Sequence, residues 1–240
     1  DAVSGNRQRL TIDGDAALVR LTSGAQADLY RTNASGTSGS IDIQKGATLG
    51  VSGALMLDAT AENTLSGTIA ANGASLALGA GRISLGADSR ASGLVLSNAL
   101  LSSLTPSEVI LSSGSDIGIY GAPAINAKSL TLHTGGLTGY AGSVAGASLT
   151  ADSITLDNRN NALLAGAGDG TSSLAFNAKT LTLGSGAYGF SGFSAVNLNA
   201  SQGLTAQGNI DLKAASNLNI TTPYVTAGRG TNAKIDASGY

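Results

Sequence analysis

Short runs of alternating apolar and polar residues recur along the chain. The clearest are 129–132 (SLTL), 153–156 (SITL) and 180–183 (TLTL), with looser copies at 196–198, 210–212 and 218–220. Alternation places successive side chains on opposite sides of a β-strand, and Gly, Ala, Ser, Asn or Asp follows each run, so each strand ends in a turn. A recurrence of roughly 20 to 27 residues is typical of a solenoid, whose coils stack to bury their apolar side.

Other apolar alternations predict how each coil is divided into faces. Three pairs lie about seven residues apart, the spacing of two faces joined by a corner: Leu76 with Ile83, Ile110 with Ile117, and Leu174 with Leu181. We assign the third face to Leu94, Leu137, Leu204 and Tyr224. The 240 residues then predict an all-β, parallel β-helix of roughly ten coils with three short strands each, about 50 Å long.

The chain is predicted to be a single β-helix segment over 1–240, with less regular coils in 1–63 and regular coils in 64–240. One departure is 97–106, where Asn98 could cap a short helical turn that Pro106 ends. The sequence begins without Met or a leader-like run and stops soon after a strand-like run at 233–237. We therefore expect an internal segment of a longer protein.

Composition is consistent with narrow coils. The chain has 34 Gly, which tight corners use, and 42% hydrophobic residues, enough for a sizeable core. It has no Trp, one Met, six Tyr and three Phe, so small aliphatic side chains fill the interior.

Charge and cysteine content argue against several classes of function. Only 12% of residues are charged and the net charge is −2, so the basic stripe that binds nucleic acid or anionic membranes is missing. The absence of Cys removes disulfides and thiol chemistry. No apolar run is long enough to cross a bilayer, and we expect no direct membrane insertion.

Candidate chemistry is sparse. His133 is the only histidine, so we interpret it as a corner or solvent-facing residue rather than part of a triad or metal site. The turn 166–170 (GAGDG) has one carboxylate, too few ligands for calcium. The most polar loop is 157–161, whose residues Asp157, Asn158 and Arg159 could grip a sugar or carboxylate, although Asx-rich corners are commonly just turns.

Aromatic residues are concentrated in 188–193, where Tyr188 could form an exposed platform for a carbohydrate or, as we prefer, fill a coil interior. Amides at Asn197, Asn199, Asn209, Asn217 and Asn219 could form ladders between coils. Acidic residues show no pattern that converges on a cleft. We therefore predict no enzymatic activity, no catalytic or metal-binding residue and no cofactor, and keep Asp157, Asn158, Arg159 and Tyr188 as surface-contact candidates.

The order of several phrases resembles the large filamentous-haemagglutinin-like surface proteins of Gram-negative bacteria. The resemblance covers most of the chain from about residue 64 and lies in 82–87 (RISLGA), 93–99 (GLVLSNA), 115–121 (SDIGIYG), 129–132, 181–184, 191–193 and 196–201. It implies a right-handed parallel β-helix from the shaft of an exported protein, which an outer-membrane pore carries across by two-partner secretion. Such proteins start with a secretion domain bearing Asn-Pro motifs; no Asn-Pro pair occurs here, so the resemblance implies that this domain lies outside the segment.

The expected function is that of a structural and adhesive shaft of a secreted filament at the bacterial cell surface, which attaches to cells or surfaces through many weak contacts. Expected partners are the outer-membrane secretion pore, host-cell or surface glycans, and further copies through coil ends or lateral contacts. Two alternatives stay open: a β-helical polysaccharide-active enzyme, and a passive spacer that presents a tip toxin or adhesin domain.

Overall fold

The computed structural model describes residues 7–142 and 145–237, and these residues form strands with a single short helix. In chain order the elements are β1 (Arg9–Asp13), β2 (Ala17–Thr22), β3 (Asp28–Thr32), β4 (Ser40–Ile43), β5 (Thr48–Gly50), β6 (Ala54–Ala59), β7 (Glu62–Leu65), β8 (Thr68–Ala70), β9 (Ser75–Ala80), β10 (Ile83–Leu85), β11 (Leu94–Leu96), α1 (Asn98–Ser103), β12 (Glu108–Ser113), β13 (Ile117–Tyr120), β14 (Ala124–His133), β15 (Gly136–Tyr140), β16 (Ala147–Asp157), β17 (Ser173–Leu183), β18 (Gly186–Ser191), β19 (Ala195–Ala206), β20 (Asn209–Ala214), β21 (Asn217–Thr221), β22 (Val225–Ala227) and β23 (Asn232–Asp236).

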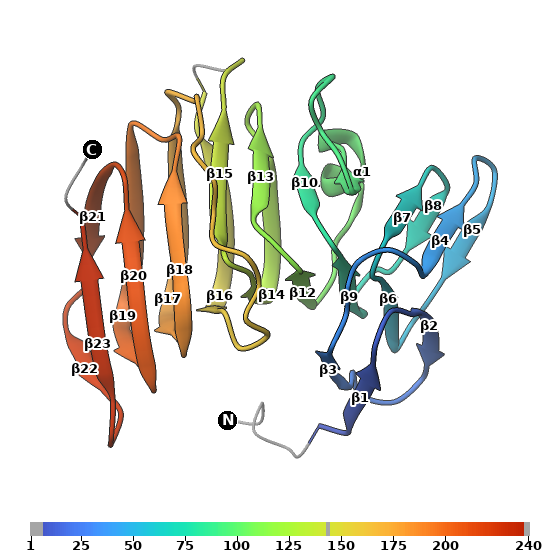
Figure 1. Cartoon of the computed structure of the whole chain (residues 1–240), viewed down its shortest axis with the longest axis horizontal. Coiled ribbons are helices and arrows are strands. Elements are labelled where there is room, and N and C mark those ends of the chain that lie inside the picture. The colour runs from blue at the N-terminus through green and yellow to red at the C-terminus, as the bar shows by residue number, and fades with distance from the viewer. Residues whose placement is uncertain (1–6, 143–144, 238–240) are drawn as a thin grey trace.

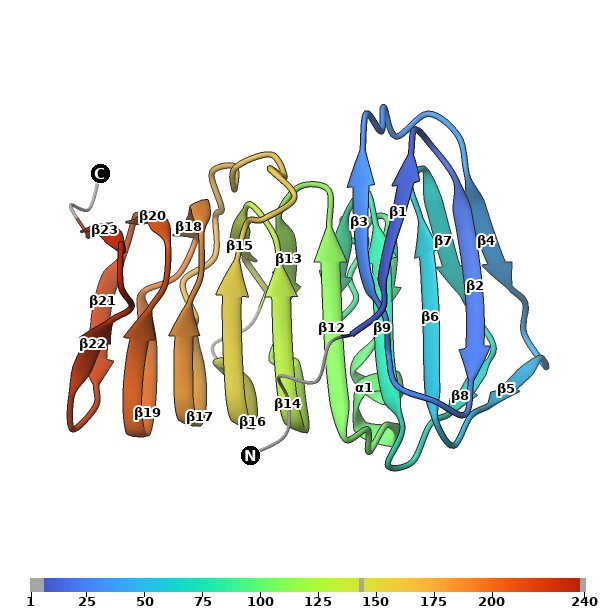
Figure 2. The ribbon, with the colours of Figure 1, turned by 90° about the horizontal axis from the view of Figure 1, so that it is seen from below.

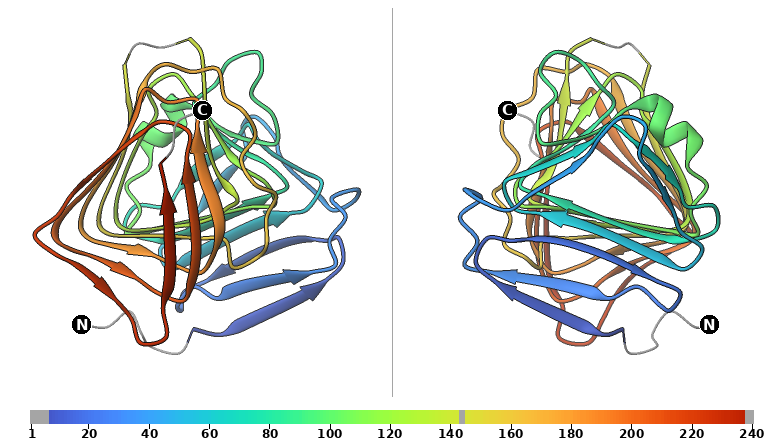
Figure 3. Two further views of the ribbon diagram at one scale, coloured as in Figure 1. Left: turned by 60° about the vertical axis from the view of Figure 1, so that its left-hand side comes forward. Right: turned by 90° about the vertical axis from the view of Figure 1, so that its right-hand side faces the viewer.

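Most strands stack in two long sheets that run the length of the molecule (Figure 1). One sheet has ten strands in the order β2-β6-β9-β12-β14-β16-β17-β19-β21, with β22 also paired to β19; the other has seven, in the order β11-β10-β13-β15-β18-β20-β23. Seen along the stack, the coils enclose a roughly triangular interior (Figure 3). The predicted all-β parallel solenoid of about ten turns is confirmed.

The long strands β14, β16, β17 and β19 each cover two faces of a coil. Their ladders run on both sides of an unpaired corner residue, Lys128 in β14, Asp152 in β16 and Lys179 in β17. The third face is thus continuous with the ten-stranded sheet. Three residues assigned to a third face from the sequence lie elsewhere. Leu94 and Leu137 belong to the seven-stranded sheet, and Leu204 pairs with Leu181, which was assigned to another face.

The recurring phrase marks one register position on successive coils. Ser129 pairs with Ser153, and Ser153 with Thr180, so the three copies are stacked side by side. Their apolar residues point inward and are buried, whereas the intervening threonines are only partly covered. Sequence spacing varies because loops differ in length, while the ladder remains in register.

The interior is a continuous column of aliphatic side chains, as the composition predicts. Phe176 and Phe190 lie within it with ring centroids 5.8 Å apart, and Tyr188 is 2% exposed. Burying a Leu, Ile or Phe side chain stabilises the fold by about 1.5–3 kcal/mol. Stacked coils therefore stabilise one another.

Not every coil contributes one strand to each of the two long sheets. The chain forms β11 after β10 but places it on the side of β10 that faces β7, which adds one strand to the seven-stranded sheet. After β16 the chain adds none, because residues 158–172 form no strand and β15 pairs directly with β18. The added strand and the omitted strand compensate for each other. From β17 onward each coil again contributes one strand to each sheet.

Residues 7–32, the N-terminal cover, lie outside the first coils (Figure 2). Strands β1 and β3 pair with each other, and β2 pairs antiparallel with β6. Leu10, Leu18 and Leu29 pack on outward-facing residues, among them Met56 and Ile110. The cover gives these apolar outer positions a second, smaller core.

The predicted helical turn is present as α1, although its cap differs from the prediction. Ser97, not Asn98, is the N-cap, and its side chain accepts a hydrogen bond from the Leu100 N–H. No helix of the described residues has the length and apolarity needed to cross a membrane.

Candidate functional site

The most irregular feature of the surface is the extruded segment, residues 158–172, which takes the place of the omitted strand but lies outside the sheet. Figure 1 shows it as a gold loop that runs in front of β15, beside β18. Three of its backbone N–H groups donate to carbonyl groups of the coils: Leu163 to Gly114, Ala165 to Gly135 and Gly170 to Gly139, each at 3.1 Å. The segment is therefore fixed to the solenoid along its length.

Glycines on both sides of this contact make the close approach feasible. A Cβ atom at Gly135 would lie 1.7 Å from the carbonyl oxygen of Leu163, and one at Gly139 would lie 2.1 Å from that of Gly192. Gly168 would meet Gly139 and Gly192 in the same way. These positions need glycine because backbone packs directly on backbone.

The turn 166–170 is held by an ion pair. Asp169 lies 3.0 Å from a guanidinium nitrogen of Arg90 and accepts a hydrogen bond from the Ala141 N–H at 2.9 Å. The Ala141 hydrogen bond, followed by the charge of Arg90, lowers the pKa of Asp169. Among the described residues, no three His, Cys, Asp or Glu side chains gather as a metal site would require.

The three polar candidates Asp157, Asn158 and Arg159 lie where the extruded segment leaves the ladder, and each has partners within the chain. Asn158 is 4% exposed, and its side chain bonds to the backbone of Ala162 and Ala187. Its amide shapes the turn and is not available to a ligand.

Arg159 reaches from the extruded segment to the N-terminal cover. Its guanidinium lies over the Tyr30 ring, 4.7 Å from the centroid, and 3.8 Å from an Asp28 carboxylate oxygen. Arg31 of the cover likewise pairs with Asp58 of β6. Burial raises the pKa of Asp58, against the opposing effect of Arg31. These charges fasten the cover to the coils.

His133 is the last residue of β14, at a corner as one of its two predicted positions had it, but its side chain is buried and does not face solvent. It is 3% exposed, and its Nδ1 lies 2.6 Å from Oδ1 of Asp157 on the next coil. Ser112 is its register neighbour on the other side. Ser112, His133 and Asp157 thus occupy the same register position on three successive coils. Among the described residues no hydrogen bond joins Ser112 to His133, so these side chains do not form a connected triad.

Tyr188 has no exposed ring to offer. Its side chain points into the coil and its hydroxyl donates to the Gly184 carbonyl oxygen at 3.2 Å. Burial, followed by the charge of Asp157, raises the pKa of Tyr188 far above its ordinary value. The aromatic run plugs the interior, the alternative that the sequence favoured.

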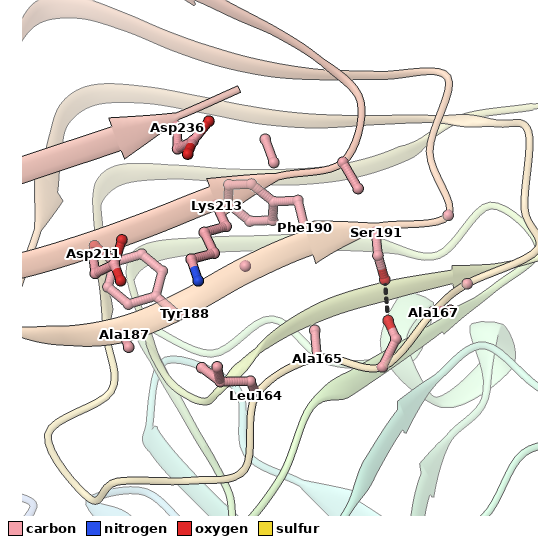
Figure 4. A pocket seen from close by; sticks show the side chains of 16 residues that line it. Leu164, Ala165, Ala167, Ala187, Tyr188, Phe190, Ser191, Asp211, Lys213 and Asp236 are labelled. Carbon is pink, nitrogen blue, oxygen red and sulfur yellow. Dashed lines mark hydrogen bonds between the residues drawn. The ribbon is translucent and has the colours of Figure 1, made fainter. Parts of the chain in front are cut away.

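Two grooves flank the extruded segment. The cover groove, about 580 Å³, lies toward the N-terminal cover and is lined by residues that include Arg31, Asp58, Ser112 and Asn160. The lateral groove, about 460 Å³, lies toward the C-terminal coils (Figure 4). In the cover groove, Arg31 and Asp58 already pair with each other.

The lateral groove has a flat floor and two unlike walls. Ala187, Gly189 and Ser191 of β18 form the floor, the extruded segment forms one wall, and the other wall carries Asp211 and Lys213 of β20. The Ser191 hydroxyl donates to the Gly166 carbonyl oxygen and joins floor to wall at one end. The groove runs along the strands.

The charged wall contains groups without partners in the chain. Oδ1 of Asp211 is shielded from solvent and has no hydrogen-bond donor. The Lys213 side chain, at the next outward position of the strand, makes no ion pair or hydrogen bond with residues 7–142 and 145–237, although its register neighbour Asp236 of β23 also lines the groove. A ligand with both a donor and an acceptor would satisfy this wall.

No protein-family model, curated protein sequence or solved structure matches this chain. The sequence located the start of the extruded segment through its polar run, but it missed the lateral groove. Its floor is made of small residues and its wall comes from a segment that forms no strand, so no local pattern distinguishes it.

Proposed function

We propose that this chain forms part of the structural and adhesive shaft of a secreted bacterial surface filament, and that it is related to the filamentous-haemagglutinin-like exported proteins. The observation that carries the proposal is the ladder from β6 to β21, whose inward rows are mainly apolar and in which each coil packs on the next. Such a rod holds its outer side chains at fixed positions. Repeated weak contacts along it add up through multivalency.

The proposal assigns no enzymatic activity. The carboxylates around the extruded segment hold parts of the chain together: Asp58 pairs with Arg31, Asp157 with His133 and Asp169 with Arg90. A polysaccharide-active β-helix would instead need a pair of free acids facing one cleft. Of the two carboxylates that line the lateral groove, Asp211 has an oxygen without a donor, whereas Asp236 lies 3.7 Å from the Lys234 ammonium. We therefore favour the adhesive role over the enzyme.

The proposed partners are an outer-membrane secretion pore acting on the full-length protein and glycans on cells or surfaces. Self-association through coil ends or lateral contacts is a further part of the proposal. We propose no nucleic-acid partner, because the net charge is −2.

Two measurements test the proposal. Antibodies raised against the chain should label intact cells of the source bacterium and its culture medium; labelling confined to the cytosolic fraction would refute the surface location. Beads coated with the folded chain should attach to cell layers more than albumin-coated beads do. Equal attachment would favour the passive spacer.

A further inference from the structure

We propose that the lateral groove binds an extended peptide of another protein, which adds as a strand to the free edge of the extruded segment. This inference rests on the groove itself and does not depend on the proposed surface location. The class of partner is a short, extended polypeptide with small side chains and one acidic residue.

Backbone groups of the extruded segment divide into two sets. Leu163 and Ala165 donate their N–H groups to carbonyl groups of the coils. The N–H groups of Leu164 and Gly166 take no part in that contact. Neither has a partner among the described residues, and both residues line the groove. Free N–H groups along a groove are what strand addition uses.

The floor of the lateral groove is low and flat. Ala187 and Gly189 project little or nothing above β18, so a peptide backbone can lie close to the sheet (Figure 4). The volume of about 460 Å³ falls within the range of small ligand sites. The wall from Leu164 to Gly168 is five residues long, which suits a peptide of about five residues.

The charged wall offers one acceptor and one cation. Oδ1 of Asp211 lacks a donor, and the Lys213 ammonium forms no ion pair with the described residues, its register neighbour Asp236 included. A peptide offers both groups at once: a backbone N–H or hydroxyl for Asp211 and an acidic side chain for Lys213. Leu164, 54% exposed, adds an apolar contact at the rim. A neutral oligosaccharide could supply hydroxyl groups but no negative charge for Lys213.

The test uses the whole chain and a synthetic hexapeptide, acetylated and amidated, of alternating Thr and Ala with one Thr replaced by Glu. In NMR titrations we expect saturable shifts at the amides of Leu164, Gly166 and Gly189. The same peptide with alternate backbone nitrogens methylated should not bind, since it cannot form the ladder. Absence of shifts with the unmodified peptide at millimolar concentration would overturn the proposal.

Variants distinguish the contribution of backbone hydrogen bonds to peptide binding from that of side chains. Leu164→Pro removes one unpartnered N–H and should weaken binding by about fivefold relative to Leu164→Ala, the effect of one lost hydrogen bond. Ala187→Leu fills the floor and should abolish binding, whereas Ala175→Leu, at an outward position of β17, should not. Lys213→Glu should weaken binding of the Glu peptide but not of an all-neutral version.

Each variant's unfolding temperature shows whether it is folded. If Leu164→Pro unfolds, the pair Ala187→Leu and Ala175→Leu still decides the question. Binding that is unchanged in Ala187→Leu, or equal shifts by maltohexaose at the same amides, would refute a peptide site. Failure here leaves the bead and antibody results untouched, so the two proposals fail separately.

Discussion

His133 and Asp157 face each other on neighbouring coils, and Nδ1 of the histidine lies 2.6 Å from Oδ1 of the aspartate. Both side chains are shielded, 3% and 13% exposed. Asp157 is the last residue of β16 before the extruded segment, so this contact fixes the point at which the chain leaves the sheet.

Replacement of Asp157 tests this anchor. Asp157→Ala leaves a buried ring nitrogen without its partner and should lower the free energy of unfolding by about 1–3 kcal/mol. Asp157→Asn keeps an acceptor oxygen and should cost less. Urea titration measures both. The control is Asp152→Ala, whose carboxylate pairs with Lys179 on an exposed corner and should change stability by less than about 1 kcal/mol. Equal stability of the two alanine variants would contradict the anchor.

Gly135→Ala tests the contact between the extruded segment and the coils. The added Cβ would fall 1.7 Å from the Leu163 carbonyl oxygen, so backbone must shift, and overpacking of this kind costs about 1–3 kcal/mol. Thermal unfolding and cleavage by a protease within 158–172 report the change. Gly50→Ala is the matched control, since nothing lies within 4 Å of its Cβ position. An intact, equally resistant segment in Gly135→Ala would be inconsistent with the contact.

Asp15 should make the loop 33–38 sensitive to acid. Its carboxylate accepts N–H groups from Ser35 and Gly36 at 2.7 and 2.9 Å. The Ser35 hydroxyl, followed by the Gly36 N–H, lowers the pKa of Asp15. Because the folded pKa lies below the unfolded value of about 3.9, the stabilisation is complete above that pH and is lost as the pH falls toward the folded pKa.

Amide chemical shifts of Ser35 and Gly36, followed from pH 6 downward, measure this effect. They should stay constant to below about pH 3.9 and then move as the loop loosens. In Asp15→Asn the loop should be looser at neutral pH and indifferent to acid. A midpoint at or above the ordinary pKa of an aspartate would show that the hydrogen bonds do not hold in solution.

Phe176→Ala tests the column of stacked side chains. The ring is fully buried beside Phe190, and its loss should cost about 3–5 kcal/mol. Phe176→Leu retains most of the volume and should cost clearly less. Chemical unfolding distinguishes the two, and an effect below about 1 kcal/mol for the alanine variant would show that the interior is not close-packed there.

Much of the fold could be predicted because strand alternation is local. The apolar residues of 129–132, 153–156 and 180–183 point inward as their spacing predicts, and part of the Asn run does form ladders: Asn199 donates to Asn177, and Asn219 to Asn197, both at 2.9 Å. The stacked copies of the recurring run share one register. The sequence predicts the structure correctly wherever a residue's main contact is with the matching residue of the next coil.

Features that depend on distant segments could not be predicted. His133 is buried beside Asp157 of the next coil, a partner 24 residues away that its own strand does not reveal. The position of β11 beside β7, and the direct pairing of β15 with β18, depend on which strands meet, not on any residue pattern within them. The run 157–161 was recognised as polar, yet its bonds to Tyr30 and Asp28 join residues more than a hundred positions apart.

The strand added at β11 and the strand omitted at 158–172 compensate for each other. Between these two points the seven-stranded sheet has one strand more than the ten-stranded sheet, and beyond them the two sheets again have one strand each per coil. A solenoid that gains a layer on one side must lose one further along, or its remaining coils tilt. An extra strand in one sheet of such a chain is therefore expected to occur together with an omitted strand further along. At the omitted strand the backbone lies outside the sheet, where it can contact other molecules.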